Sequence, residues 1–100
     1  MSLISITVQD ENGKQLGERV DCSSAVFPSA GDTRFTCLRF VDPYGDTVFN
    51  QIQIPVILED LCLLKECDQG QAHQVTILRL EALCRFGQTE PHLYLKFVGD

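Results

Sequence analysis

The hydrophobic pattern of this chain changes its period at Pro55. Before that residue, apolar and polar side chains alternate, as they do around Ile4, Ile6 and Val8, which is typical of half-buried strands. After it, apolar side chains recur every three or four positions, which is typical of amphipathic helices, and residues 92–98 alternate again. The change of period therefore predicts strands, then helices, then one more strand.

Four strands are predicted ahead of Pro55, at residues 4–8, 14–20, 35–41 and 47–54. Asn12-Gly13 supplies the turn between the first two, and Gly17 marks the second as a weak edge strand. Residues 42–45, "DPYG", have the preferences of a type I turn, so that residues 35–54 should form a second hairpin. The polar stretch 21–34 between the two hairpins is predicted to be a loop.

Two helices are predicted after the strands, because Pro55 suits the first turn of a helix. The first covers residues 55–67 and is broken at 68–70; the second covers 71–86, with Gly87 as its cap. The side chains expected to face the core are Ile57, Leu58, Leu61, Cys62 and Leu64 in the first helix and Val75, Leu78, Ala82, Leu83 and Phe86 in the second. The predicted fold is a single α+β domain over residues 1–100: an antiparallel sheet, in the order β-β-β-β-α-α-β, with a helical hairpin packed on one face.

The net charge of the chain disfavours several classes of partner. The formal net charge is -6, and the 8 Lys and Arg residues are scattered. No basic stripe can neutralise a row of phosphates, so nucleic-acid binding is not expected. The apolar stretches are far shorter than the ~20 residues of a membrane span, so no membrane association is expected either. An acidic surface favours a basic protein partner; the alternative, and the commoner reason for such a charge, is that it keeps the protein soluble.

The cysteine pattern predicts reduced thiols. The chain has five cysteines and no CxxC pair: Cys22, Cys37, Cys62, Cys67 and Cys84. An odd count among mostly apolar neighbours indicates buried free thiols and, with no signal peptide in view, a cytoplasmic protein. Cys62, Cys67 and His73 lack the spacing of a zinc site, so no metal is expected there. A Cys–His nucleophilic pair with His73 or His92 stays open, because no local signature selects one.

The stretch 40–55, "FVDPYGDTVFNQIQIP", carries the candidate site residues of the middle of the chain. Asp42, Asp46 and Asn50 are hard oxygen ligands that suit Ca²⁺ or Mg²⁺. The alternative is that Asp42 bonds to its own turn and Asp46 is solvated. Turn chemistry explains neither Asn50 nor the position of Tyr44 at the tip.

His92 and Tyr94 are the candidate residues of the final strand, where they share one face with Lys96. A histidine can act as a base and a tyrosine as a hydrogen-bond donor. The alternative is that the three residues form the solvated side of the strand.

Two blocks, residues 38–55 and 91–100, resemble a group of small bacterial proteins with an LRF-x-DP-aromatic-GDTVFN block and a closing HLYL-x-F-x-GD block. The resemblance brings no activity, cofactor or partner with it. It implies positions, because the blocks contain all six candidate binding residues: Asp42, Tyr44, Asp46, Asn50, His92 and Tyr94. If the last strand lies beside the second hairpin, these six side chains should line one end or face of the sheet.

The sequence favours a non-enzymatic interaction domain that binds another protein in a regulatory or inhibitory role, because no catalytic set or cofactor motif is recognisable. The alternative is a small-ligand or divalent-metal-binding protein, an enzyme included, with its site at residues 42–50 and the final strand. A third option is a homodimer formed through an exposed face of the sheet.

Overall fold

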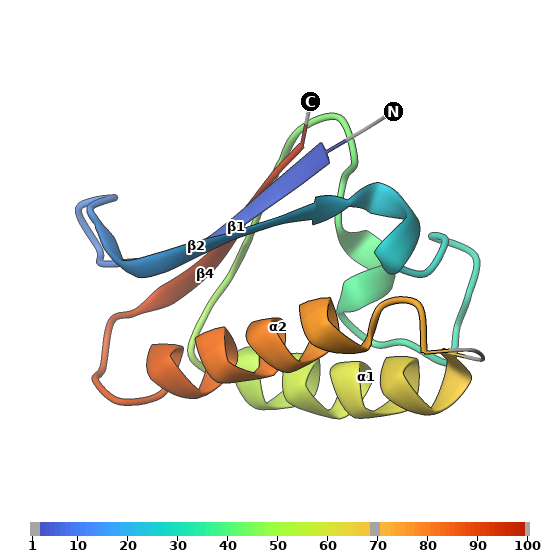
Figure 1. Cartoon of the computed structure of the whole chain (residues 1–100). Helices are drawn as coiled ribbons and strands as arrows, with labels where there is room; N and C mark the ends of the chain where they lie inside the picture. The colour runs from blue at the N-terminus through green and yellow to red at the C-terminus, as the bar shows by residue number, and fades with distance from the viewer. Residues whose placement is uncertain (1–2, 69–70, 100) are drawn as a thin grey trace.

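The computed structural model describes residues 3–68 and 71–99. Figure 1 shows a sheet with two helices packed below it. The elements in chain order are β1 (Leu3–Gln9), β2 (Gln15–Ser23), the 3₁₀ helices η1 (Ser24–Val26) and η2 (Leu38–Phe40), β3 (Asp46–Phe49), α1 (Ile54–Cys67), α2 (Gln74–Gly87) and β4 (Tyr94–Val98). The predicted α+β class, with an antiparallel sheet and a helical hairpin on one face, is confirmed.

The sheet has the order β2-β1-β4-β3, and every neighbouring pair is antiparallel. The last strand of the chain, β4, therefore lies between β1 and β3. The alternation of β1 decides which face is buried: Ile4, Ile6 and Val8 are each at most 1% exposed, and they face the helices. The neighbouring positions Ser5 and Thr7 belong to the opposite, open face. The hairpin at residues 10–14 is confirmed, and Gly13 has the positive φ of 83° that such a turn requires.

The two helices are joined by an ion pair as well as by apolar contacts. Glu81 of α2 is buried, and Lys65 of α1 donates to both of its carboxylate oxygens at 3.0 and 3.2 Å. A buried carboxylate needs such a partner.

Helix α1 begins at Ile54 with Pro55 in its first turn, as predicted. It ends at Cys67, and the predicted break at 68–70 includes residues 69–70, which lie outside the described residues.

The prediction of a strand at residues 35–41 is wrong. Phe35, Cys37 and Leu38 are buried, but Leu38–Phe40 is a 3₁₀ helix. Asp60 of α1 holds this segment: its carboxylate accepts hydrogen bonds from the backbone N–H groups of residues 36, 37 and 38 at 3.1, 2.7 and 2.9 Å. Three consecutive amides directed at one carboxylate cannot serve a strand ladder. The second predicted hairpin, at residues 35–54, is therefore absent, and β3 pairs with β4 instead.

No helix within residues 3–68 and 71–99 has the length and apolar character that crossing a membrane requires.

Candidate interaction surface

The turn at residues 42–46 uses its own carboxylates. Asp42 Oδ1 accepts the backbone N–H of Tyr44 at 2.9 Å, which is the bonding pattern of an Asx turn. Asp46 forms an ion pair with Lys96 of β4 at 3.6 Å. The Tyr44 ring is 75% exposed at the tip. The carboxylates predicted as possible cation ligands thus already have partners within the protein.

Asn50 prepares the entry into α1. Its Oδ1 accepts the backbone N–H groups of Ile52 and Gln53 at 3.0 and 3.1 Å, and its own N–H donates to Gln53 Oε1 at 2.9 Å. These bonds satisfy donors in the turn that precedes the helix. The turn at residues 42–46 does not account for this asparagine, but the turn that leads into α1 does.

His92 and Tyr94 lie at the end of the sheet away from the 42–46 turn. Asp46 is opposite Val98, at the far end of β4, whereas Tyr94 is opposite Gln9 of β1. The five residues of β4 separate these two ends by at least ~13 Å, at about 3.3 Å per residue. His92 precedes the strand and is exposed, and its Nδ1 lies 4.0 Å from Glu11 Oε2. The structure does not bring the six predicted residues together.

The two sequence blocks, residues 38–55 and 91–100, nevertheless lie close together at both ends of the β3–β4 pair. At one end, Gly99 N–H donates to Gly45 O at 2.8 Å, and a Cβ on Gly99 would collide with the Pro43 carbonyl oxygen. At the other end, the side-chain amide of Gln51 donates to the carbonyls of Gly87, Glu90 and Leu93 at 2.6, 3.0 and 3.2 Å. These contacts give the two blocks a structural role: they fasten β3 to β4 and to the end of α2.

The cysteines divide into two groups, and all five are free thiols. Cys22, Cys37 and Cys84 are buried as predicted, but Cys62, predicted to face the core, is exposed together with Cys67. Cys67 and His73 line a common cavity of about 250 Å³, in which Arg34 Nη1 lies 3.6 Å from Cys67 Sγ. Over residues 3–68 and 71–99, no group of three His, Cys, Asp or Glu side chains is arranged to hold a metal ion.

Thiol labelling should separate these two groups. Burial raises the pKa of the Cys22 thiol to about 11 and that of Cys84 to about 12, and it also raises the pKa of Cys37. These three thiols stay protonated at pH 8, and only thiolates react. With Ellman's reagent at pH 8, two thiols of the folded protein should react quickly and three should react only after denaturant is added. A third fast thiol in the folded protein would contradict the structure.

Helix α2 presents an apolar stripe to solvent. The prediction that Val75, Leu78, Ala82 and Phe86 face the core is wrong. Val75 is 72% exposed, Leu78 53% and Phe86 39%. Leu83 faces the core as predicted, and Ile77, Leu80 and Cys84 lie there with it. The helix is apolar on two sides, and only one of them is covered.

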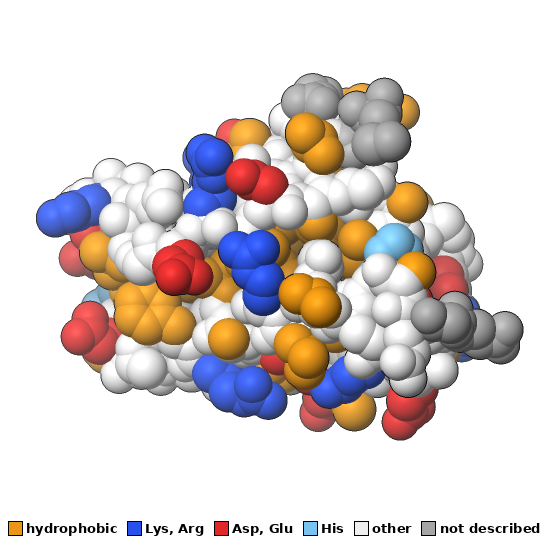
Figure 2. Space-filling view, viewed as in Figure 1, with side chains coloured by type: hydrophobic (Ala, Val, Ile, Leu, Met, Phe, Trp, Pro, Cys, Tyr) orange, Lys and Arg blue, Asp and Glu red, His pale blue; other side chains and the backbone are white. Residues whose placement is uncertain are grey.

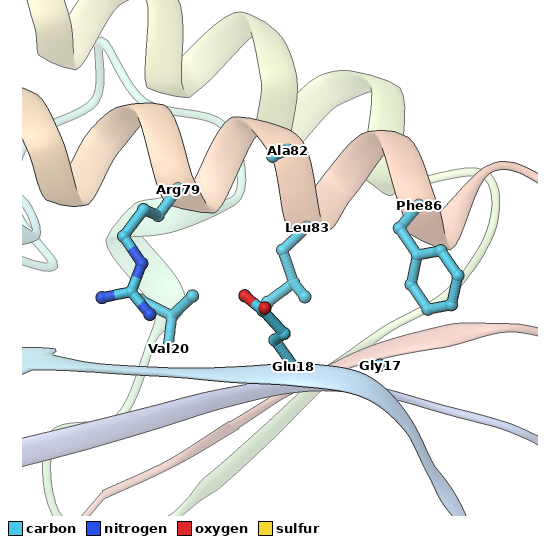
Figure 3. A pocket seen from close by; sticks show the side chains of 7 residues that line it. All are labelled: Gly17, Glu18, Val20, Arg79, Ala82, Leu83 and Phe86. Atoms are coloured by element: carbon cyan, nitrogen blue, oxygen red, sulfur yellow. The ribbon is translucent and has the colours of Figure 1, made fainter.

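A groove runs between this stripe and strand β2. It has a volume of about 290 Å³ and is lined by Gly17, Glu18, Val20, Arg79, Ala82, Leu83 and Phe86. Figure 3 shows Arg79, Leu83 and Phe86 extending from α2 toward β2, and Glu18 and Val20 extending from β2 toward α2. Gly17 has a φ of +74°, and a Cβ there would lie 2.9 Å from the Phe86 ring. Glycine at this position therefore lets the ring approach the strand.

Strand β2 is an edge strand, as its sequence predicts. Edge strands carry backbone groups that another strand can pair with. We use "edge surface" for three features together: strand β2, the groove, and the α2 stripe of Val75, Leu78, Ala82 and Phe86. β2 and α2 lie at the front of Figure 1, and on the same face in Figure 2 hydrophobic side chains are mixed with basic and acidic ones.

Comparison of the chain with family models, curated proteins and solved structures finds no match. The class that the fold defines is a small α+β domain, an antiparallel four-stranded sheet covered on one face by two helices.

Proposed function

We propose that this protein is a non-enzymatic interaction domain, acting in the cytoplasm in a regulatory or inhibitory role, and that the edge surface is where it binds its partner. The observation that carries the proposal is the exposed stripe on α2. Single exposed apolar residues are ordinary on protein surfaces. Here Val75, Leu78 and Phe86 lie on one side of one helix, beside a groove. Exposed apolar side chains grouped on one side of a helix in this way are a mark of an interaction site.

The edge strand adds a second mode of recognition to the same surface. An extended segment of a partner can pair with β2 through backbone hydrogen bonds, while the groove receives its side chains. Such pairing gives affinity through the backbone and specificity through the alternate side chains. Both parts of the edge surface thus suit a protein partner and not a small, highly charged ligand.

The other residues that could have bound a ligand or a metal ion have structural partners within the protein. Asp42 bonds its own turn, Asp46 pairs with Lys96, and Asn50 organises the start of α1. The geometry therefore favours binding by the edge surface over ligand or metal chemistry at residues 42–50.

The charges on the edge surface indicate which charges the partner should present. The chain as a whole carries a net charge of -6, which favours a basic partner. The edge surface, however, carries charges of both signs: Arg19 and Arg79 against Glu18 and Asp21. A partner seated there is expected to present mixed charges and apolar side chains.

Site-specific photocrosslinking tests the proposal. Benzoylphenylalanine at position 78, in place of Leu78, should give a discrete adduct when the protein is irradiated in its native extract, because this side chain lies within the proposed contact. The same group at the exposed position of Glu59 on α1 is the matched control and should give none. Equal labelling from both positions, or no adduct from position 78, would overturn the proposal.

A further inference from the structure

We infer that the partner seated on the edge surface is a second copy of this chain, joined through antiparallel pairing of β2 with β2 about a two-fold axis at Val20. The inference rests on the proposed function and names its partner. Symmetric pairing of this kind uses the same surface on both copies. It would extend the four-stranded sheet of one copy into that of the other.

Strand geometry limits the possible registers. Directly opposite residues of an antiparallel pair lie on the same face of the sheet, so a symmetric pair must be centred on a residue that faces its own counterpart. With Val20 at the centre, Val20 meets the partner's Val20 on the helix-covered face. Arg19 then lies opposite the partner's Asp21, and Asp21 opposite the partner's Arg19, both on the open face.

The neighbouring registers are unfavourable. A pair centred on Arg19 places two arginines directly opposite each other, and a pair centred on Asp21 does the same with two aspartates. Like charges in such positions destabilise a sheet, whereas opposite charges stabilise it. The register at Val20 forms two such opposite-charge pairs.

The side chains involved are positioned for this arrangement. Arg19 Nε lies 3.1 Å from Asp21 Oδ1 within one copy, with the two side chains 58% and 47% exposed. Ser5 Oγ donates to the same carboxylate oxygen at 2.6 Å and holds Asp21 on the open face. The remaining donors of the guanidinium and the second carboxylate oxygen can reach across the axis.

The charges of the edge surface and the length of β2 also favour pairing with a second copy at this place. Two chains of charge -6 repel each other over most of their surfaces, but less where charges of both signs alternate. β2 has nine residues, and its register against β1 shifts between Leu16 and Val20; the other edge strand, β3, has four residues. Pairing at β2 would also bring the exposed α2 stripes of the two copies toward one another.

Charge reversal tests the inference. Arg19→Asp gives each copy two acids at the axis, and Asp21→Arg gives two bases, so each variant should lose affinity for itself by on the order of tenfold to a hundredfold. An equimolar mixture of the two variants should form a one-to-one heterodimer, because every pair across the axis is again of opposite sign. The double variant Arg19→Asp/Asp21→Arg should self-associate like the wild type. Light scattering coupled to size exclusion measures all of these masses.

Controls separate this inference from the proposed function. Lys14→Asp, in the exposed hairpin beyond the axis, should leave the mass of the wild-type dimer unchanged, and circular dichroism should show each variant folded. A wild type that stays at 11.2 kDa at its highest soluble concentration, or a variant mixture that stays monomeric, overturns the inference. If position 78 then still crosslinks to a different protein, the interaction function stands with another partner. If position 78 crosslinks to no protein, both the pairing of two copies and the proposed interaction function are wrong.

Discussion

Replacing Asp60 with alanine should lower the free energy of unfolding by about 4 kcal/mol, because three backbone donors at residues 36–38 would lose their acceptor inside the protein. Asp60 is 4% exposed, and no other acceptor for these amides lies among the hydrogen bonds of residues 3–68 and 71–99. Unfolding in urea, monitored by circular dichroism, gives the loss through the shift in the transition midpoint.

Two further variants make the Asp60 result specific. Glu59→Ala, at the exposed neighbouring position on α1, should change the stability by less than about 0.5 kcal/mol. Asp60→Asn keeps one acceptor oxygen and should fall between the wild type and Asp60→Ala. If Asp60→Ala loses less than about 1 kcal/mol, the carboxylate does not anchor this segment as described.

Replacing Gln51 with glutamate should destabilise the protein by about 3 kcal/mol at pH 7. The change removes a donor that serves the carbonyls of Gly87, Glu90 and Leu93, and it places a carboxylate among their oxygens. Protonation of the new side chain restores one donor, so the deficit relative to wild type at the same pH should shrink as the pH is lowered toward 4. Paired urea titrations at both pH values measure this.

Ile52→Glu is the matched control for Gln51→Glu. It introduces the same charge one residue away, at a position that is 82% exposed, and should change the stability by less than about 0.5 kcal/mol at either pH. An equal loss in both variants would assign the effect to charge in this turn and not to the three carbonyl bonds.

Much of the fold was predictable because its signals are local. The alternation of Ile4, Ile6 and Val8, the turn glycine at position 13 and the proline at the start of α1 each act within a few residues. The segment at 35–41 was predicted incorrectly because its apolar residues resemble those of a buried strand. Its conformation depends on Asp60, which is 22 to 24 residues away in the sequence.

The candidate surface was predictable only in part. β2 was identified as an edge strand, and the apolar stripe of Val75, Leu78, Ala82 and Phe86 was recognised but assigned to the core. Periodicity locates such a stripe without showing which of two apolar sides is covered. The six candidate binding residues were chosen for their chemistry and for their place in the two blocks. Asp42 and Asn50 are explained by bonds to neighbouring backbone, which a pattern of residue types does not distinguish from a ligand site.

The position of β4 in the middle of the sheet determines when the sheet can form while the chain is being synthesised. While the ribosome is still adding residues 94–98, β1 and β3 lack the strand that joins them, and the apolar side chains that β4 will cover stay in contact with water. The sheet can therefore close only after residues 94–98 have left the ribosome. Until then the nascent chain exposes two incomplete halves of a core, a state in which a chaperone can prevent aggregation.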